Sequence, residues 1–92
     1  MRWKLFANLA ETAGTREVAV DVEPGGTFRE AFDALVETHP ALREDLLDED
    51  GELYEHIRVL HNTENPFVSG DGWETTLKAG DELALFPPVS GG

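Results

Sequence analysis

The chain passes through Glu82-Leu83-Ala84-Leu85-Phe86 into Pro87-Pro88-Val89-Ser90-Gly91-Gly92, a strand pattern followed at once by a proline-rich segment that ends in two glycines. Residues 82–86 alternate like a strand that packs one face on a core. The two prolines lack N–H donors and favour an extended course, so they end sheet pairing. The final glycines have no side chains, so the carboxylate of Gly92 can enter a narrow channel in another protein. We predict a folded domain at 1–86 and a flexible tail at 87–92.

The composition describes a single small domain. The chain has 92 residues, 40% of them apolar, which is enough for one hydrophobic core. It contains no cysteine, and therefore no disulfide framework, thiolate metal site or cysteine nucleophile. The apolar run near Met1 is too short for a signal peptide, and no run of about 18 apolar residues is available to span a bilayer. We expect a cytoplasmic protein that is a monomer when free.

The charge balance is strongly acidic. Asp and Glu number 19 against 7 Lys and Arg, which gives a formal net charge of -12. Such a surface repels phosphate groups, so neither nucleic acid nor an anionic membrane is expected as a partner. A basic partner surface is one explanation of the excess. We favour a salt-loving host, because molar salt shortens the screening length to about 3 Å and removes most of the self-repulsion.

Apolar periodicity predicts four strands, at residues 1–10, 17–22, 56–62 and 82–86. The first two are expected to form a hairpin with Gly14 in its turn. Met1, Trp3, Leu5, Ala7 and Leu9 would share one face of the first strand.

Helix signals lie between the second and third strands. Thr27-Phe28-Arg29-Glu30 forms a capping box, which starts a helix that stops before Pro40. A short second helix is predicted at 40–47 and an acidic turn, rather than a calcium loop, at 48–52. Residues 63–72 are predicted to be a loop, anchored to the body by Phe67, Val68 and Trp73.

This order of elements predicts an α+β fold of the β-grasp type, with a mixed sheet and one main helix across one face. Side-chain parity then places Phe6, Leu60 and Phe86 on the opposite face, as an apolar patch beside the tail. Exposed apolar clusters usually mark binding surfaces. The alternatives are that Phe67 or Val68 folds over this face, or that a register shift of one residue turns the three inward.

Several of these motifs together resemble a known family. Lys4-Leu5-Phe6-Ala7, the capped helix, Asn62 and the run from Leu77 to Gly92 are similar to the small subunit of molybdopterin synthase and to the ubiquitin-like small archaeal modifier proteins. The Gly80-Asp81-Glu82 turn, the alternating strand and the Pro-Pro-Val-Ser-Gly-Gly ending form a specific combination. The acidity fits haloarchaeal members, whereas segments 49–55 and 63–73 are longer than in the shortest sulfur carriers.

The resemblance implies that a partner enzyme activates Gly92. An E1-like enzyme would adenylate its carboxylate with ATP. The product would become a thiocarboxylate for molybdopterin (molybdenum cofactor) biosynthesis, or would be joined to lysines of target proteins by an isopeptide bond. Phe6, Leu60 and Phe86 would dock on that enzyme or on the large catalytic subunit of molybdopterin synthase. The tail residues that would thread into its active site are Pro87, Pro88, Val89, Ser90 and Gly91.

This chain would be a carrier rather than an enzyme. It has no phosphate-binding glycine motif, so ATP belongs to the partner and no cofactor is expected on this chain. His39, His56 and His61 show no metal or catalytic-triad spacing, and no metal site is expected. Lys4 and Lys78 are the side-chain amines that could accept another tail, or else ordinary surface cations.

Three functions are compatible with the sequence. A modifier and a sulfur carrier use the same tail residues, and we prefer a protein that does both. A dedicated sulfur-carrier subunit of molybdopterin synthase without conjugation is the first alternative. A β-grasp binding module whose tail is never activated is the second.

Overall fold

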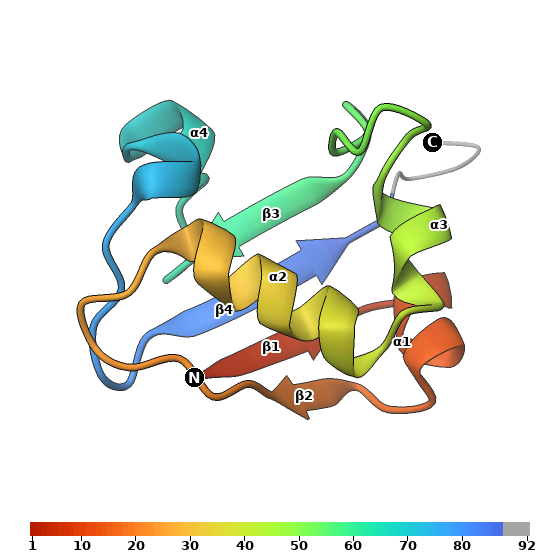
Figure 1. The fold of residues 1–92 in the computed structure, drawn as a ribbon, viewed down its shortest axis with the longest axis horizontal. Coiled ribbons are helices and arrows are strands. Elements are labelled where there is room, and N and C mark those ends of the chain that lie inside the picture. Colours follow the sequence, from red (N-terminus) through yellow and green to blue (C-terminus); the bar gives the residue numbers. More distant parts are fainter. Residues whose placement is uncertain (88–92) are drawn as a thin grey trace.

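A sheet of four strands in the order β2-β1-β4-β3 forms one layer of the computed structural model, which describes residues 1–87. Helix α2 crosses one face of this sheet (Figure 1). The strands are β1 (Arg2–Leu5), β2 (Glu17–Ala19), β3 (Arg58–His61) and β4 (Glu82–Phe86). The helices are α1 (Asn8–Ala13), α2 (Phe28–Thr38), α3 (Leu42–Leu46) and α4 (Pro66–Ser69), with a 3-10 turn, η1, at Gly72–Glu74.

The sheet is mixed, as predicted. β1 pairs antiparallel with β2 and parallel with β4, while β3 pairs antiparallel with β4. The last strand therefore lies beside the first, in the centre of the sheet, and β3 forms one edge. This arrangement confirms the α+β, β-grasp fold.

The core lies between α2 and the sheet, and Trp3 is at its centre. Trp3 is fully buried, and its indole Nε1 donates a hydrogen bond to the carbonyl of Ala31 on α2 at 3.0 Å. Its ring meets Phe28 and Phe32 edge-on, with centroids 5.5 and 6.3 Å away. Buried side chains from the strands complete this layer: Leu5, Val18, Val59, Leu83 and Leu85.

Helix α2 begins where the sequence predicts. The Thr27 hydroxyl accepts a hydrogen bond from the backbone N–H of Glu30 at 3.3 Å, which satisfies one of the free donors of the first turn. The helix ends at Thr38, directly before His39 and Pro40. Its apolar face is buried except for Val36, which lies at the margin of the core.

The predicted first strand is too long. It ends at Leu5, and the backbone turns at Ala7, which has a φ of 52° and an exposed side chain. Leu9 is buried as predicted, but from helix α1 rather than from a strand. Gly14, with a φ of 79°, ends that helix in the left-handed conformation that suits glycine. The alternating pattern continued past the strand because a short amphipathic helix also places apolar residues close together.

The segment predicted to be a loop at 63–72 contains α4 and leads into η1. Asn65 caps α4 by accepting the N–H of Phe67 at 2.8 Å, and the buried Pro66 occupies its first turn. Trp73 packs on Phe32 with ring centroids 5.1 Å apart, so its predicted anchoring role is confirmed. Val68 does not anchor the segment, because 81% of it is exposed.

Helix α3 and the acidic turn follow the prediction closely. α3 lies within the predicted range and is joined to α1 by the Thr12 hydroxyl, which donates to Asp45 at 2.7 Å. In the turn, the Asp48 carboxylate accepts the N–H groups of Asp50 and Glu52 at 2.8 and 3.0 Å. Within residues 1–87, the helices are all too short or too polar to cross a membrane.

Candidate functional site

Phe6, Leu60 and Phe86 come together on the sheet face opposite α2, as side-chain parity predicts. The rings of Phe6 and Phe86 stack with centroids 4.2 Å apart. Phe6 is 40% exposed, and Leu60 and Phe86 are half-buried. With four neighbours these residues line a hollow of about 410 Å³, which we call the outer groove; the neighbours are Ala7, His56, Arg58 and Pro87.

The strand register explains this grouping. In β4, Leu83 and Leu85 point into the core, so Ala84 and Phe86 point to the other face. Leu60 on β3 pairs with Ala84, whose small side chain leaves space between Leu60 and the phenylalanines. Phe67 does not fold over this face, because its ring packs on Trp73 on the side of α2. The grouping is therefore found in the structure, and its role in binding stays a prediction.

Ala7 sets the position of Phe6. Its φ of 52° and ψ of -130° turn the chain from β1 into α1 directly after Phe6. This conformation is unusual for a residue with a Cβ and carries a strain of about 1–3 kcal/mol. Its carbonyl accepts hydrogen bonds from the N–H groups of Ala10 and Glu11 at 3.1 and 3.2 Å, which fixes the start of α1.

Basic residues gather on or beside the outer face of the sheet in this acidic protein, and Arg58 among them lines the outer groove. Arg2 and Lys4 on β1 and Arg58 on β3 share the outward parity, and Arg16 lines an adjacent hollow with Lys4 and Phe6. These are four of the 7 cationic residues in the chain. Two of them are in exposed ion pairs, with 3.7 Å between Arg2 and Glu17 and 3.5 Å between Lys4 and Glu82.

The predicted tail begins at the outer groove. Pro87 is half-buried and lines the groove beside Phe86. The other predicted tail residues lie outside the described residues, namely Pro88, Val89, Ser90, Gly91 and Gly92. The division into a domain at 1–86 and a flexible tail stays a prediction.

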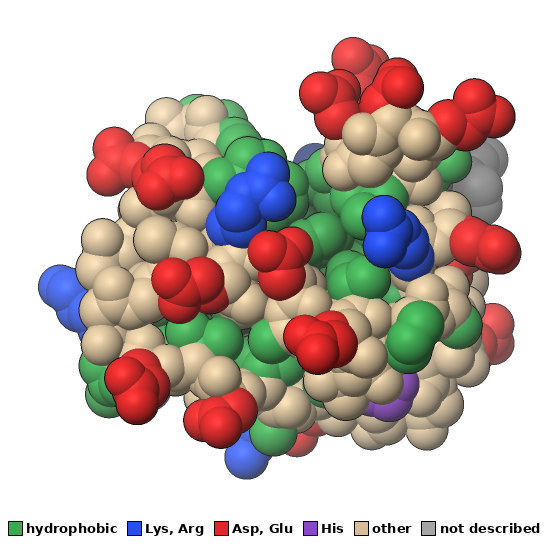
Figure 2. Space-filling model, viewed as in Figure 1, with side chains coloured by type: hydrophobic (Ala, Val, Ile, Leu, Met, Phe, Trp, Pro, Cys, Tyr) green, Lys and Arg blue, Asp and Glu red, His purple; other side chains and the backbone are tan. Residues whose placement is uncertain are grey.

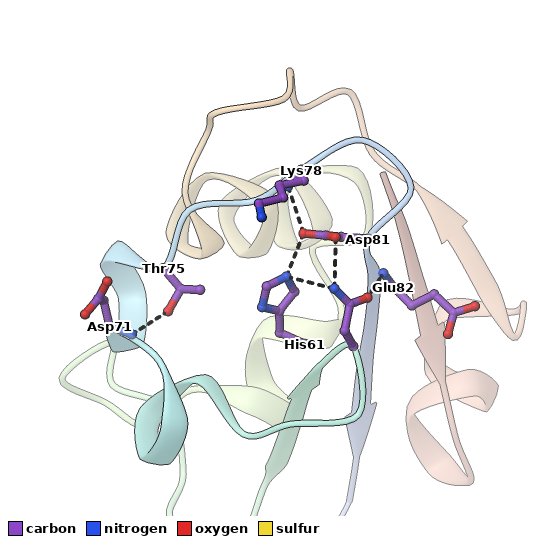
Figure 3. Close-up of polar contacts among 7 residues, drawn as sticks. His61, Asp71, Thr75, Lys78, Asp81 and Glu82 are labelled. Atoms are coloured by element: carbon purple, nitrogen blue, oxygen red, sulfur yellow. Dashed lines mark hydrogen bonds and ion pairs between the residues drawn. The ribbon is translucent and has the colours of Figure 1, made fainter.

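A polar network ties β3 to the turn before β4 (Figure 3). The Asp81 carboxylate lies 2.7 Å from His61 Nε2 and accepts hydrogen bonds from the Asn62 side chain at 2.9 Å and the Lys78 N–H at 2.8 Å. Asn62 Oδ1 in turn accepts the N–H of Glu82 at 2.8 Å. Burial raises the pKa of Asp81, but the hydrogen bonds from His61, Asn62 and Lys78 outweigh it and lower that pKa to about 2.

This network is structural, and the sequence pattern did not reveal it. Asn62 has a φ of 51°, in the left-handed region that asparagine tolerates better than most residues. Its side chain bonds to both Asp81 and Glu82, so it holds the turn after β3 against the start of β4. The sequence indicates one turn at Asn62 and another at Gly80-Asp81-Glu82. No local pattern in the sequence indicates that these two turns are hydrogen-bonded to each other.

The three histidines are dispersed. His61 is bound to Asp81, His56 stacks on Tyr54 with ring centroids 5.1 Å apart, and His39 follows the end of α2. In the described part of the chain, residues 1–87, there is no group of three or more potential metal-binding side chains.

The two lysines occupy different environments. Lys4 lies on the outer face, where its ion pair with Glu82 leaves 44% of its side chain exposed. Lys78 is exposed in the turn before β4, at the opposite end of that strand from Phe86. Both amines stay predicted acceptors.

Comparison with known proteins supports the family resemblance. Residues 3–92 match the model of the ThiS family. The chain is 58% identical over 92 residues to small archaeal modifier protein 1 of Haloferax volcanii, with 100% of each chain covered. A crystal structure of SAMP1 from Haloferax volcanii matches with a TM-score of 0.89 and 55% identity, covering 100% of this chain and 98% of that one.

A less similar solved structure supports the resemblance to the small subunit of molybdopterin synthase. A putative molybdopterin converting factor, subunit 1, from Pyrococcus furiosus matches with a TM-score of 0.74 and 25% identity, covering 96% of this chain and 95% of that one. The resemblance inferred from the sequence is thus confirmed. Similarity to a Haloferax protein also agrees with the interpretation of the acidic composition as halophilic.

Proposed function

This chain belongs to the ThiS family and has ubiquitin-like modifiers and sulfur carriers as relatives, and from that premise we propose that a partner enzyme activates the carboxylate of Gly92. The observation that carries the proposal is the outer groove. It places an exposed apolar surface at the end of β4, where the chain continues into Pro87 and the glycine tail. A partner that binds this groove would receive the tail directly.

The chemistry explains why activation is needed. A free carboxylate has a pKa of about 3.5 and is ionised at pH 7, so it is a poor acyl donor. An E1-like enzyme would join the Gly92 carboxylate to AMP and release pyrophosphate from ATP. Sulfur at the oxidation level of hydrosulfide would then attack the acyl carbon and displace AMP, which gives a thiocarboxylate. Alternatively, a lysine amine of a target protein would displace AMP and form an isopeptide bond.

The groove residues supply recognition rather than catalysis. Phe6, Leu60 and Phe86 would be buried by the partner, and burial of apolar area contributes roughly 25 cal/mol per Å². Arg58 and His56 on the rim would meet carboxylates of that partner. We expect the same groove to serve the activating enzyme and the large catalytic subunit of molybdopterin synthase, so the two would compete.

A dedicated sulfur carrier without conjugation is the second candidate. The likeness to a protein described as subunit 1 of a molybdopterin converting factor favours it. The higher identity to a small archaeal modifier protein favours the dual role. Sulfur accepts the acyl group in both candidates, and they differ in whether a lysine amine of a target protein also accepts it.

Mass spectrometry of the protein from its native host tests the proposal. Intact and peptide masses are compared in cells with and without the E1-like enzyme. Replacement of oxygen by sulfur at Gly92 identifies a carrier, and Gly92 joined to lysines of other proteins identifies a modifier. Finding neither product, with no change when the enzyme is absent, would overturn activation.

A truncated chain separates activation from simple binding. Removal of Gly91-Gly92 leaves the outer groove intact. The chain then ends in a carboxylate two residues nearer the groove, and the carboxylate of Gly92 is lost. If the truncated chain keeps its partner binding and full biological activity, the protein is a β-grasp binding module and the tail chemistry is wrong.

A further inference from the structure

A second hollow lies on the other side of the sheet from the outer groove. It is open between α2, α4 with η1, and the segment after α3. Figure 2 shows hydrophobic side chains at its base, with both acidic and basic side chains around it. Buried Phe32, Ile57 and Val59 form its floor, and the hollow has a volume of about 590 Å³. We call it the helix-side cleft.

Aromatic walls are the main feature of this cleft. Phe67 is 43% exposed although its ring meets Trp73 edge-on at 5.1 Å and Phe28 at 6.1 Å. Trp73 and Tyr54 are half-buried and complete the wall. These rings are held by packing before any ligand arrives, so binding would cost little ordering entropy. Rigid, partly exposed aromatic side chains in a hollow are typical anchors of protein recognition.

The charge at the rim indicates the sign of the charge that a partner would carry. Exposed Asp33, Glu52 and Glu55 line the cleft. Among the described residues that line it, Arg29 is the single cation, and its guanidinium already lies 5.1 Å from the centre of the Trp73 ring. The rim therefore attracts positive charge, and a second copy of this chain, also at -12, would be repelled.

We propose that the helix-side cleft binds a segment of a partner protein that inserts a large apolar side chain flanked by lysine or arginine. The apolar side chain would meet Phe67 and Trp73, and the flanking cations would meet the rim carboxylates. This combination uses the floor, the walls and the charge of the cleft together.

The two hollows flank the same edge strand. Val59 of β3 lines the helix-side cleft, while Arg58 and Leu60 line the outer groove. A ligand in the cleft would thus leave the outer groove and Pro87 free. If the proposed function holds, the cleft stays accessible after Gly92 has been joined to a target; the binding itself does not depend on that function.

Nuclear magnetic resonance of the full, unconjugated, ¹⁵N-labelled chain tests the cleft. The probe is a synthetic peptide with adjacent leucine and phenylalanine flanked by two lysines on each side. One control peptide has serine in place of both apolar residues, and another has glutamate in place of the lysines. We expect shifts of the Trp73 indole and the Phe67 and Tyr54 amides with the probe, and binding about tenfold or more weaker with either control.

Matched charge reversals locate the interaction. Glu52→Lys with Glu55→Lys reverses two rim carboxylates, and Asp21→Lys with Glu23→Lys makes the same change in net charge near the opposite edge of the sheet; all four side chains are exposed. The rim pair should weaken the peptide about tenfold and the distant pair less than about twofold.

Several results would overturn the proposal. Equal weakening by both pairs would mean unspecific attraction to an acidic protein. Shifts centred on Phe6 and Phe86 would assign the peptide to the outer groove. Concentration-dependent shifts at Trp73 without peptide would mean that a second copy of the chain covers the cleft. Because Gly92 stays unmodified throughout, none of these results bears on activation of the tail.

Discussion

The ring of Phe6 lies nearly flat on the ring of Phe86, with an interplanar angle of 11° and centroids 4.2 Å apart. This stack joins the end of β1 to the end of β4 directly before Pro87. Stacked aromatic pairs contribute about 0.5–1.5 kcal/mol beyond their buried area. The pair therefore fixes the point from which the chain leaves the sheet, while Phe6 keeps much of its ring open to a partner.

Replacement of Phe6 by alanine should affect activation more than folding. Phe6→Ala removes the stack, so we expect the free energy of unfolding to fall by about 1–2 kcal/mol. Loss of an anchor from the docking surface should lower kcat/KM for adenylation by about tenfold or more. Urea unfolding measures the first effect, and pyrophosphate exchange with the E1-like enzyme measures the second.

Val68→Ala is the matched control for that change. Val68 is 81% exposed and lies on α4, away from the outer groove. Its replacement should leave both measurements within error. Normal adenylation of the Phe6→Ala protein would show that the outer groove is not the docking surface.

Replacement of Ala7 by glycine should stabilise the fold or cost little, unlike replacement of an alanine inside a helix. Ala7 has a φ of 52°, where a Cβ is unfavourable, so Ala7→Gly relieves strain that offsets the added entropy of the unfolded chain. Ala34→Gly, in the middle of α2, should lower the free energy of unfolding by about 1 kcal/mol. Thermal unfolding of both variants makes the comparison. An equal loss at the two positions would mean that Ala7 carries no strain.

Parity and capping are the features that the sequence determines well. Alternation places Leu83 and Leu85 inward and Phe86 outward regardless of where the strand ends, and Thr27 begins α2 because its hydroxyl can satisfy a free N–H. Both depend on neighbours within a few residues. The predicted grouping of Phe6 with Phe86 followed from this parity once the strand order was assigned.

Short helices and long-range polar contacts are the features that the sequence does not predict. α1 and α4 have 6 and 4 residues, too few for a helical period to separate from strand alternation or loop composition. The pair Asn65-Pro66 is as typical of a turn as of a helix start, and here it forms the cap and first turn of α4. The bonds of Asp81 to His61 and Asn62 join residues 19 or 20 positions apart, so only the folded sheet brings them together.

The Asp81 network predicts a loss of stability in acid. The pKa of Asp81 is about 2 in the folded chain against an ordinary 3.8, so the unfolded chain takes up the proton first as the pH falls. Its contribution, about 2 kcal/mol, is complete above about pH 4 and is lost as the pH falls from about 4 towards 2. Urea unfolding at a series of pH values measures this loss.

Asp81→Asn removes the titrating group and serves as the test. The variant should be less stable by about 2 kcal/mol at pH 7 and should lack this part of the acid dependence. Asp21→Asn, at an exposed position after β2, should change stability by less than about 0.5 kcal/mol. If Asp81→Asn keeps the full acid dependence of the natural chain, other carboxyl groups cause it.

Salt should stabilise this protein strongly. With a net charge of -12 on 92 residues, mutual repulsion of carboxylates opposes folding in dilute buffer, and molar potassium chloride screens it within about 3 Å. We expect the unfolding temperature to rise by about 10 °C or more from dilute buffer to molar salt, since 1 kcal/mol corresponds to about 4–8 °C for a domain of this size. Sucrose serves as the control, because it adds no ions and stabilises folded proteins by being excluded from their surface. It therefore distinguishes that effect from the screening of charge. Equal unfolding temperatures in both salt conditions would show that the carboxylates do not adapt the fold to salt. The remaining explanation would then be a basic partner, and the acidic rim of the helix-side cleft would be the first place to look for it.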